Sequence, residues 1–180
     1  MNFDNIFNIP LIHTQVNNWI PKKKQLLEQC GELKISGKEF VETNFHSNLE
    51  NKKLSRDVMN VEKILKEELT IFEYNIGYKI DVNGSWIERS TKGMYHELHN
   101  HGQLGYSAAC FLSFDPKVHT PTQFIAPFNN PLNGLIVKHI PENITEGTLL
   151  FFPSMLLHYT QPNLSTKERI VLSFNLALRH

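Results

Sequence analysis

The chain has 180 residues, and its 18 Lys and Arg are balanced by 18 Asp and Glu, so its formal charge is zero. This balance excludes the strongly basic surface of proteins that bind nucleic-acid phosphates or anionic lipids. A hydrophobic content of 41 % is sufficient for a packed core, and the length fits one domain over residues 1–180. The unusual feature is nine histidines in a neutral chain.

The amino terminus lacks a basic region followed by an unbroken apolar core, and no stretch approaches the ~18 apolar residues of a membrane span. We therefore expect a cytoplasmic protein without a membrane partner. Two cysteines, Cys30 and Cys110, are too few for a disulfide framework or a cysteine-based zinc site. Buried, reduced thiols are the expected state of both.

Residues 1–80 are predicted to be largely helical support. Asn17 or Asn18 can cap a first helix that stops at Gly31, and Ser55 can cap a second that stops before Gly77. The apolar residues of both segments recur at helical spacing and should pack on a sheet. They are Trp19, Ile20, Leu26, Leu27 and Cys30 in the first, and Val58, Val61, Ile64, Leu65, Leu69 and Phe72 in the second.

Beyond a change of layer at residues 80–84, short segments alternate in polarity and are separated by Gly, Pro and Asn, which is typical of strands. The predicted strands are Ser85–Ser90, Met94–His99, Tyr106–Phe114, Thr122–Phe128, Leu135–Ile140, Thr148–Phe152, Leu157–Tyr159 and Arg169–Leu178. Many short strands behind two helices indicate a mainly β fold, a cupin-like jelly roll over residues 84–180 with helices on one face.

Three histidines, His96, His99 and His101, lie within six positions. Residues two apart on an extended chain project to the same side, so His99 and His101 can reach one metal ion, while His96 should point away. Glu97 shares the side of His99 and His101 and is therefore a candidate ligand or hydrogen-bond partner. Histidines at a polar strand end are the competing interpretation.

A fourth histidine, His158, lies in an otherwise apolar segment. Burying an imidazole without a partner costs ~1–3 kcal/mol, so His158 must be hydrogen-bonded or bind something. If its strand returns beside the one that ends near His101, three imidazoles converge.

The last predicted strand has apolar residues at every even position, and its odd positions include Arg169 and Ser173. One face is therefore core. The other face is either exposed to water or lines the cavity of the jelly roll. In a cavity, the guanidinium and hydroxyl would form a fork for a carboxylate.

From Trp86 to Asn175 the chain resembles the 2-oxoglutarate and Fe(II)-dependent oxygenases, in particular their small microbial and phage members. The resemblance is carried by an ordered set of residues. The set is Trp86, Gly93, His99, His101, Ser107, Gly147, Phe152, Pro153, His158, Arg169, Ser173, Phe174 and Asn175.

The resemblance implies a double-stranded β-helix in which His99, His101 and His158 bind Fe(II). Arg169 and Ser173 would then bind the distal carboxylate of 2-oxoglutarate, leaving room for O2. Decarboxylation of 2-oxoglutarate to succinate would be coupled to oxidation of a substrate C–H bond, most simply hydroxylation. We expect five further residues to surround this centre: Tyr95, His96, Glu97, Tyr106 and Asn175. Tyr95 or Tyr106 is the expected source of a hydroxyl group.

The sequence departs from the commoner family pattern at His101, where most members have a carboxylate. Three neutral ligands leave the site one charge unit more positive. They also occur in cupin-type dioxygenases that act on thiols without 2-oxoglutarate, so that function stays open, as does completion of the triad by Glu97. A zinc site closed by Glu97 or His96 and a jelly-roll binding module without catalysis are two further interpretations of the same residues.

A nuclease of the His-Asn-His type is excluded by the adjacency of His99, Asn100 and His101 and by the neutral charge. The loop from Asp115 to Asn133, in which His119 should be exposed, is a candidate rim for substrate selection. The sequence does not distinguish a peptidyl from a small-molecule substrate, nor a monomer from a homodimer.

Overall fold

The computed structural model describes residues 9–28, 34–35, 40–45 and 60–179, which form two antiparallel sheets and a helical layer. The larger sheet has the strand order β1-β9-β6-β11-β4-β3-β2. Its strands are β1 (Ile12–Gln15), β2 (Lys34–Ile35), β3 (Glu42–Thr43), β4 (Ile80–Ser90), β6 (Tyr106–Ser113), β9 (Thr148–Pro153) and β11 (Arg169–Leu178). The smaller sheet has the order β5-β10-β7-β8. Its strands are β5 (His96–His99), β7 (Gln123–Asn129), β8 (Ile136–His139) and β10 (Leu157–Thr160).

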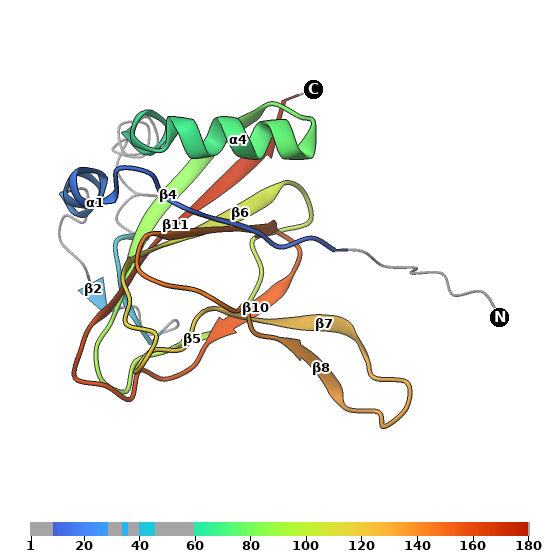
Figure 1. The fold of residues 1–180 in the computed structure, drawn as a ribbon. Coiled ribbons are helices and arrows are strands. Elements are labelled where there is room, and N and C mark those ends of the chain that lie inside the picture. The colour runs from blue at the N-terminus through green and yellow to red at the C-terminus, as the bar shows by residue number, and fades with distance from the viewer. Residues whose placement is uncertain (1–8, 29–33, 36–39, 46–59, 180) are drawn as a thin grey trace.

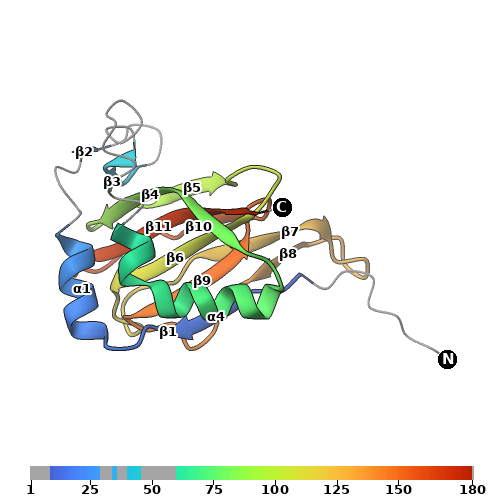
Figure 2. The same ribbon diagram turned by 90° about the horizontal axis from the view of Figure 1, so that it is seen from above.

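The helices α1 (Trp19–Leu27) and α4 (Lys66–Ile76) lie over one face of the larger sheet, and a helical turn at 60–64 precedes α4. The smaller sheet lies on the opposite side, and the β7–β8 hairpin projects beyond it (Figure 1). Seen from above, α4 lies over the strands of the larger sheet and α1 lies near their ends at one side (Figure 2). This arrangement confirms the predicted jelly roll with helices on one face.

Two apolar clusters fill the spaces on either side of the larger sheet. One lies under the helices and joins Leu69 and Phe72 of α4 to Leu172, Phe174 and Leu176 of β11. The other lies between the sheets and is dominated by phenylalanines; it includes Phe111, Phe114, Phe124, Phe152 and Val171. The even positions of β11 therefore face the helices, as predicted, and its odd positions face the space between the sheets.

The prediction that residues 1–80 are largely helical is wrong for three short segments, which form β1, β2 and β3 at the edges of the larger sheet. These strands have two to four residues, too short for a period-two pattern to show in the sequence. They are defined by their neighbours: Ile12 pairs with Phe151, and Glu42 pairs with Arg89. Tertiary pairing, not local propensity, decides their conformation.

Most of the other strands begin or end within one or two residues of their predicted bounds. Two further differences concern the start of β4 and the cap of α1. Strand β4 already begins at Ile80, so residues 80–84 continue a strand and do not change layer. Asn18 occupies the position before α1 with φ 49°, but its side chain makes no capping hydrogen bond. The predicted stop at Gly31, the predicted cap at Ser55 and the apolar residues Cys30 and Val58 lie outside the described residues.

The end of α4 agrees with its prediction. Gly77 terminates the helix in the left-handed conformation, with φ 75°, as expected for a glycine after the last turn. In the described part of the chain, none of the helices has the length and apolar character needed to cross a bilayer. Cys110 is a buried free thiol, and burial raises its pKa, so it is protonated at neutral pH.

Candidate metal centre

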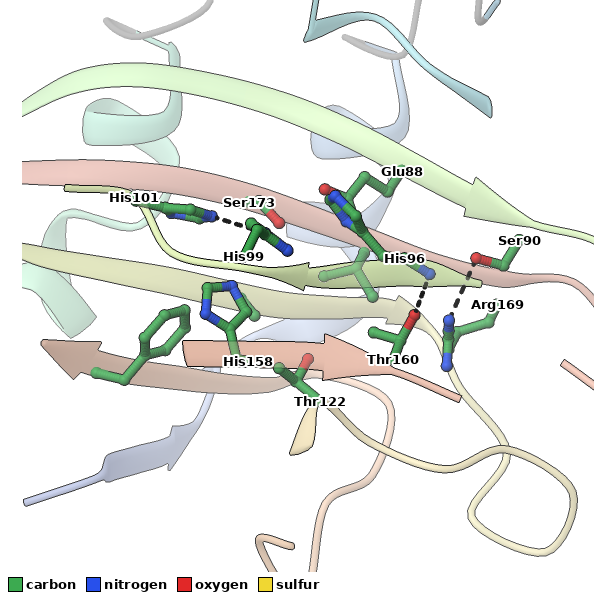
Figure 3. Close-up of a pocket in the computed structure, with 13 residues that line it drawn as sticks. Glu88, Ser90, His96, His99, His101, Thr122, His158, Thr160, Arg169 and Ser173 are labelled. Atoms are coloured by element: carbon green, nitrogen blue, oxygen red, sulfur yellow. Dashed lines mark hydrogen bonds and ion pairs between the residues drawn. The ribbon is translucent and has the colours of Figure 1, made fainter. Parts of the chain in front are cut away.

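Three imidazoles converge between the two sheets. His99 ends β5, His101 follows it, and His158 lies in β10 directly opposite His99. One ligand nitrogen from each residue lies within 4.8 Å of those of the other two, and the Nε2 atoms of His99 and His101 are 3.2 Å apart. Figure 3 shows the three rings turned toward one another at one end of a pocket.

The turn after β5 brings His101 back to this centre. The backbone N–H of His101 donates to the carbonyl of Ser154, at 2.9 Å. Gly102 follows with φ 109° and Gly105 with φ 82°, conformations that L side chains rarely adopt. The glycines therefore allow the tight path that returns the chain to β6.

Each of the three rings is oriented by an acceptor at its Nδ1 atom. His99 Nδ1 lies 2.7 Å from the carbonyl oxygen of Glu97, and His158 Nδ1 lies 2.8 Å from that of Leu156. His101 Nδ1 lies 2.9 Å from Asn175 Oδ1 and 2.8 Å from Ser107 Oγ. Carbonyl acceptors assign the proton to Nδ1, which leaves the Nε2 lone pair of each ring available to a ligand.

Burial favours the neutral state that metal binding requires. Burial, together with the neighbouring His99 ring, lowers the pKa of His101 to about 4 and that of His158 to about 3. Both imidazoles are therefore uncharged at pH 7 and need not lose a proton to bind a cation. Three imidazole nitrogens directed at one point fit a divalent transition metal, and among the described residues this group offers three potential ligands, which would leave other coordination positions open.

A buried cation lies at the other end of the same pocket. Arg169 is only 3 % exposed, and its guanidinium donates to two neutral oxygens, the carbonyl of Thr120 at 3.1 Å and Ser90 Oγ at 3.3 Å. Burial lowers its pKa to about 10, so it stays charged at pH 7. None of the ion pairs among the described residues includes Arg169.

The pocket between the imidazoles and Arg169 is lined by hydroxyl groups and by the apolar side chains of Ala109, Phe152 and Val171 (Figure 3). Ser173 lies on β11 four residues beyond Arg169 and faces the same pocket. Further hydroxyl groups come from Ser90, Thr122 and Thr160. A buried guanidinium that lies among hydroxyl groups and makes no direct ion pair with a described residue is suited to a carboxylate of a small anion.

Comparison with known protein families identifies the family of this chain. Residues 84–175 match a family model described as "Putative 2OG-Fe(II) oxygenase". The chain belongs to the 2-oxoglutarate and Fe(II)-dependent oxygenase family. It is thus an oxidoreductase that uses Fe(II) and 2-oxoglutarate. A search of curated proteins finds no significant sequence match.

Solved structures share the fold of this oxygenase at low sequence identity. The epimerase SnoN from nogalamycin biosynthesis superposes with a TM-score of 0.70 at 11 % identity, covering 93 % of this chain and 77 % of that one. A Pseudomonas putida prolyl-4-hydroxylase gives 0.57 at 13 % identity, covering 96 % and 94 %. A viral collagen prolyl hydroxylase from Paramecium Bursaria Chlorella virus-1 gives 0.56 at 15 %, covering 92 % and 94 %. These likenesses support the double-stranded β-helix.

His96 of the oxygenase does not point away from the other two histidines of this segment. Its ring stacks on that of His99, with centroids 4.0 Å apart, and it lines the pocket. The cause is a bulge in β5. His99 pairs with His158 and His96 pairs with Thr160, so the interval of three residues in β5 lies opposite an interval of two residues in β10. The extra residue reverses the predicted alternation.

Of the four other residues predicted to surround the metal centre, one contacts a candidate ligand through its side chain. Glu97 is exposed and reaches His99 only through its backbone carbonyl. Tyr95 stacks on Phe40, and Tyr106 packs edge-to-face against Phe72 under the helices. Neither tyrosine lines the pocket, so the structure does not support either of them as a source of a hydroxyl group. Asn175 does contact His101.

His119, predicted to be exposed, is buried. Its Nε2 lies 3.1 Å from the carbonyl oxygen of Lys167, and its Nδ1 accepts the backbone N–H of Asp115 at 3.1 Å. Both ring nitrogens hold loops together, and the ring also contacts Phe114. His119 is therefore a structural residue that does not line the pocket.

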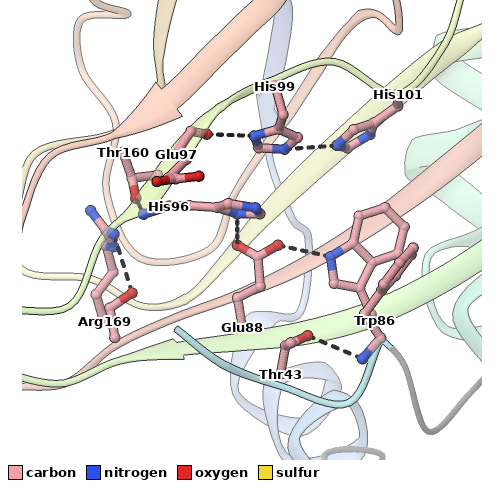
Figure 4. A network of polar contacts seen from close by, with 11 residues as sticks. Thr43, Trp86, Glu88, His96, Glu97, His99, His101, Thr160 and Arg169 are labelled. Atoms are coloured by element: carbon pink, nitrogen blue, oxygen red, sulfur yellow. Dashed lines mark hydrogen bonds and ion pairs between the residues drawn. The ribbon is translucent and has the colours of Figure 1, made fainter. Parts of the chain in front are cut away.

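Sequence reasoning missed two pocket residues on β4, Glu88 and Ser90. Alternation along this strand would have placed them on one face with Trp86, since all three are at even positions. Figure 4 shows Trp86 and Glu88 beside His96. Thr122 and Thr160 of the smaller sheet region had no distinguishing sequence signal.

Proposed function

We propose that His99, His101 and His158 bind Fe(II) in this oxygenase, and that Arg169 and Ser173 bind the distal carboxylate of 2-oxoglutarate. The observation that carries the proposal is the placement of a three-imidazole centre and a buried guanidinium in one pocket. The reaction would be hydroxylation of a substrate C–H bond.

Bound iron supplies the redox chemistry that couples O2 reduction and 2-oxoglutarate decarboxylation to oxidation of the substrate. The chain itself fixes the geometry. The Nδ1 acceptors of the three rings hold each Nε2 toward the metal position. Arg169 and Ser173 hold the cosubstrate by its remote end, so that its other end reaches the metal.

A thiol dioxygenase with three histidine ligands is the second candidate function. Arg169 would be able to pair with the carboxylate of a thiol substrate as well, so the family match is the observation that favours 2-oxoglutarate. Completion of the triad by Glu97 is not supported, because its side chain is exposed and outside the ligand group.

The substrate of this oxygenase is either a peptidyl side chain or a small molecule. The similar structures include enzymes named for peptide substrates, such as a prolyl hydroxylase in complex with a hypoxia-inducible-factor peptide, and enzymes of small-molecule biosynthesis, such as SnoN. The loop between β6 and β7 supplies Thr120 and Thr122 to the pocket region and is the candidate selector. A cytoplasmic location and a single domain over residues 1–180 stay predictions, and the choice between a monomer and a homodimer stays open.

The test is anaerobic titration with Fe(II) and 2-oxoglutarate, followed by the weak visible charge-transfer band of the chelate. We expect the band in the wild type and succinate on admission of air. Arg169→Ala should weaken 2-oxoglutarate binding by about 30-fold or more, because a buried charge pair is lost. Arg179→Ala is the matched control, since Arg179 pairs with Asp81 at the surface. No band in the wild type, or equal binding by Arg169→Ala, would contradict the proposal.

A further inference from the structure

A buried carboxylate lies in the metal pocket without being one of the ligands. Glu88 comes from β4, its side chain is 12 % exposed, and it lines the pocket together with the histidines and Arg169. Trp86 Nε1 donates to its Oε1 at 2.8 Å, and His96 Nδ1 lies 3.2 Å from its Oε2. Both oxygens are thus held in place, as Figure 4 shows.

His96 connects this carboxylate to a proposed iron ligand. The rings of His96 and His99 are stacked, with centroids 4.0 Å apart and planes 18° apart. The backbone of His96 is fixed from the other side, because its N–H donates to Thr160 Oγ1 at 2.9 Å. A movement of the Glu88 carboxylate would therefore be transmitted through His96 to the plane of His99.

Glu88 is ionised at neutral pH despite its burial. Burial by itself raises the pKa of the carboxyl group, but His96, the Trp86 indole and His99 together hold that pKa well below its usual range. The resulting negative charge acts on the whole pocket. Burial lowers the pKa of Arg169, and the Glu88 carboxylate opposes this effect.

With Fe(II) and 2-oxoglutarate bound, the pocket would carry a net positive charge that a carboxylate can neutralise. Fe(II) and Arg169 bring three positive charges, and 2-oxoglutarate brings two negative ones. With three neutral ligands one positive charge stays uncompensated in a buried site, where it is costly. A carboxylate ligand would neutralise it, but this chain has His101 at that position. Glu88 is a carboxylate that lines the same pocket.

We propose that Glu88 is a positioning residue of the metal centre, which supplies from outside the ligand set the negative charge that a three-histidine set lacks, and which orients His99 through His96. The inference rests on the proposed function, because it takes the three histidines as the metal ligands. In this proposal Glu88 of β4 compensates the positive charge of the site, as a carboxylate ligand would in the commoner family pattern.

The first test is metal affinity at one fixed pH, measured anaerobically with Co(II) as the probe and its visible spectrum as the readout. We expect Glu88→Gln, which keeps the shape and removes the charge, to bind Co(II) about 10- to 100-fold more weakly than the wild type. Glu88→Asp, which keeps the charge, should stay within about threefold. Glu42→Gln is the matched control, because Glu42 pairs with Arg89 on the neighbouring strand and does not line the pocket.

The second test moves a carboxylate into the ligand set. In a His101→Asp background the new ligand supplies the missing charge, so adding Glu88→Gln should change Co(II) affinity by less than about threefold. A purely structural role of Glu88 predicts the same loss in both backgrounds, which a double-mutant cycle detects.

The outcomes separate this inference from the function on which it rests. A wild type that does not bind Co(II) overturns the proposed metal centre itself. A wild type that binds, with Glu88→Gln binding equally well, overturns only the role of Glu88. The role is also overturned if Glu88→Asp is as weak as Glu88→Gln, or if the loss is equal with and without Asp at position 101.

Discussion

His101 differs from the other two proposed ligands in the kind of acceptor that orients it. His99 and His158 bond to backbone carbonyls two residues away, so their orientation follows directly from the chain path. His101 depends on the side chains of Ser107 and Asn175, from β6 and β11. Ser107 Oγ also donates to Asn175 Oδ1 at 3.0 Å, which orients the amide oxygen toward the ring.

Asn175→Ala should therefore weaken metal binding without removing a ligand. Loss of the acceptor frees His101 to rotate or to change tautomer, and we expect a 10- to 100-fold lower affinity for Fe(II), measured by anaerobic titration. Asn133→Ala is the control, because Asn133 only accepts a backbone N–H in an exposed turn. Equal affinities of the wild type and Asn175→Ala would show that Ser107 alone orients the ring.

Among the elements, β11 could be predicted almost completely and β5 could not. The strict alternation of β11 puts its even positions on the core face and Arg169 and Ser173 together on the other face. The pattern left open whether that second face is exposed to water or lines the cavity, and the structure places it between the sheets. In β5 the same argument put His96 on the wrong side, because the bulge opposite His158 and Thr160 arises from pairing with β10. Pairing is a tertiary property that a local pattern does not contain.

The sequence predicted that the three histidines converge only if the strand of His158 pairs beside the strand that ends near His101. That pairing is also a tertiary property. The sequence shows that His99 and His101 share a side, but only the β5–β10 pairing brings His158 opposite His99. The Glu88–His96 contact has no sequence signal either, since the two residues are on different strands of different sheets.

The turn between β5 and β6 supports a prediction about Gly105. A Cβ atom at this position would lie 2.3 Å from the carbonyl oxygen of Leu176 in β11, and φ is 82°. Gly105→Ala should lower the free energy of unfolding by about 2–4 kcal/mol, from backbone strain and overlap together. Urea denaturation measures the loss.

Gly134→Ala separates the two causes in this experiment. Gly134 has φ 71° but open space where a Cβ would stand, so the loss should be only about 1 kcal/mol. If both variants lose the same amount, the close approach to β11 does not contribute.

At the scale of the molecule, the larger sheet separates a helix-facing core from the space that holds the site. Phe72 of α4 stacks on Phe151 with centroids 4.1 Å apart, on the helix side. Phe72→Ala should cost about 3–5 kcal/mol of stability yet leave the Fe(II) affinity of the folded protein within about twofold. Chemical denaturation and anaerobic titration of the same samples measure the two quantities.

Tyr74→Ala is the control for this variant, because Tyr74 lies on the same helix and is 89 % exposed. Its stability should change by no more than about 0.5 kcal/mol. A loss of metal affinity in Phe72→Ala in parallel with stability would mean that the helical layer and the metal centre are coupled through the sheet.

Metal binding should stabilise the whole fold, because the proposed ligands come from β5, the turn after it and β10, which are together only when the sheets are formed. A ligand at a hundredfold excess over its Kd adds about 2.7 kcal/mol, which for a chain of this length raises Tm by about 5–10 °C. Thermal denaturation with Mn(II) and after chelation measures this difference. His158→Ala should lose the shift, and comparing it with and without metal cancels any effect of the substitution on folding. An equal shift in His158→Ala would place the stabilising ion elsewhere and remove His158 from the ligand set.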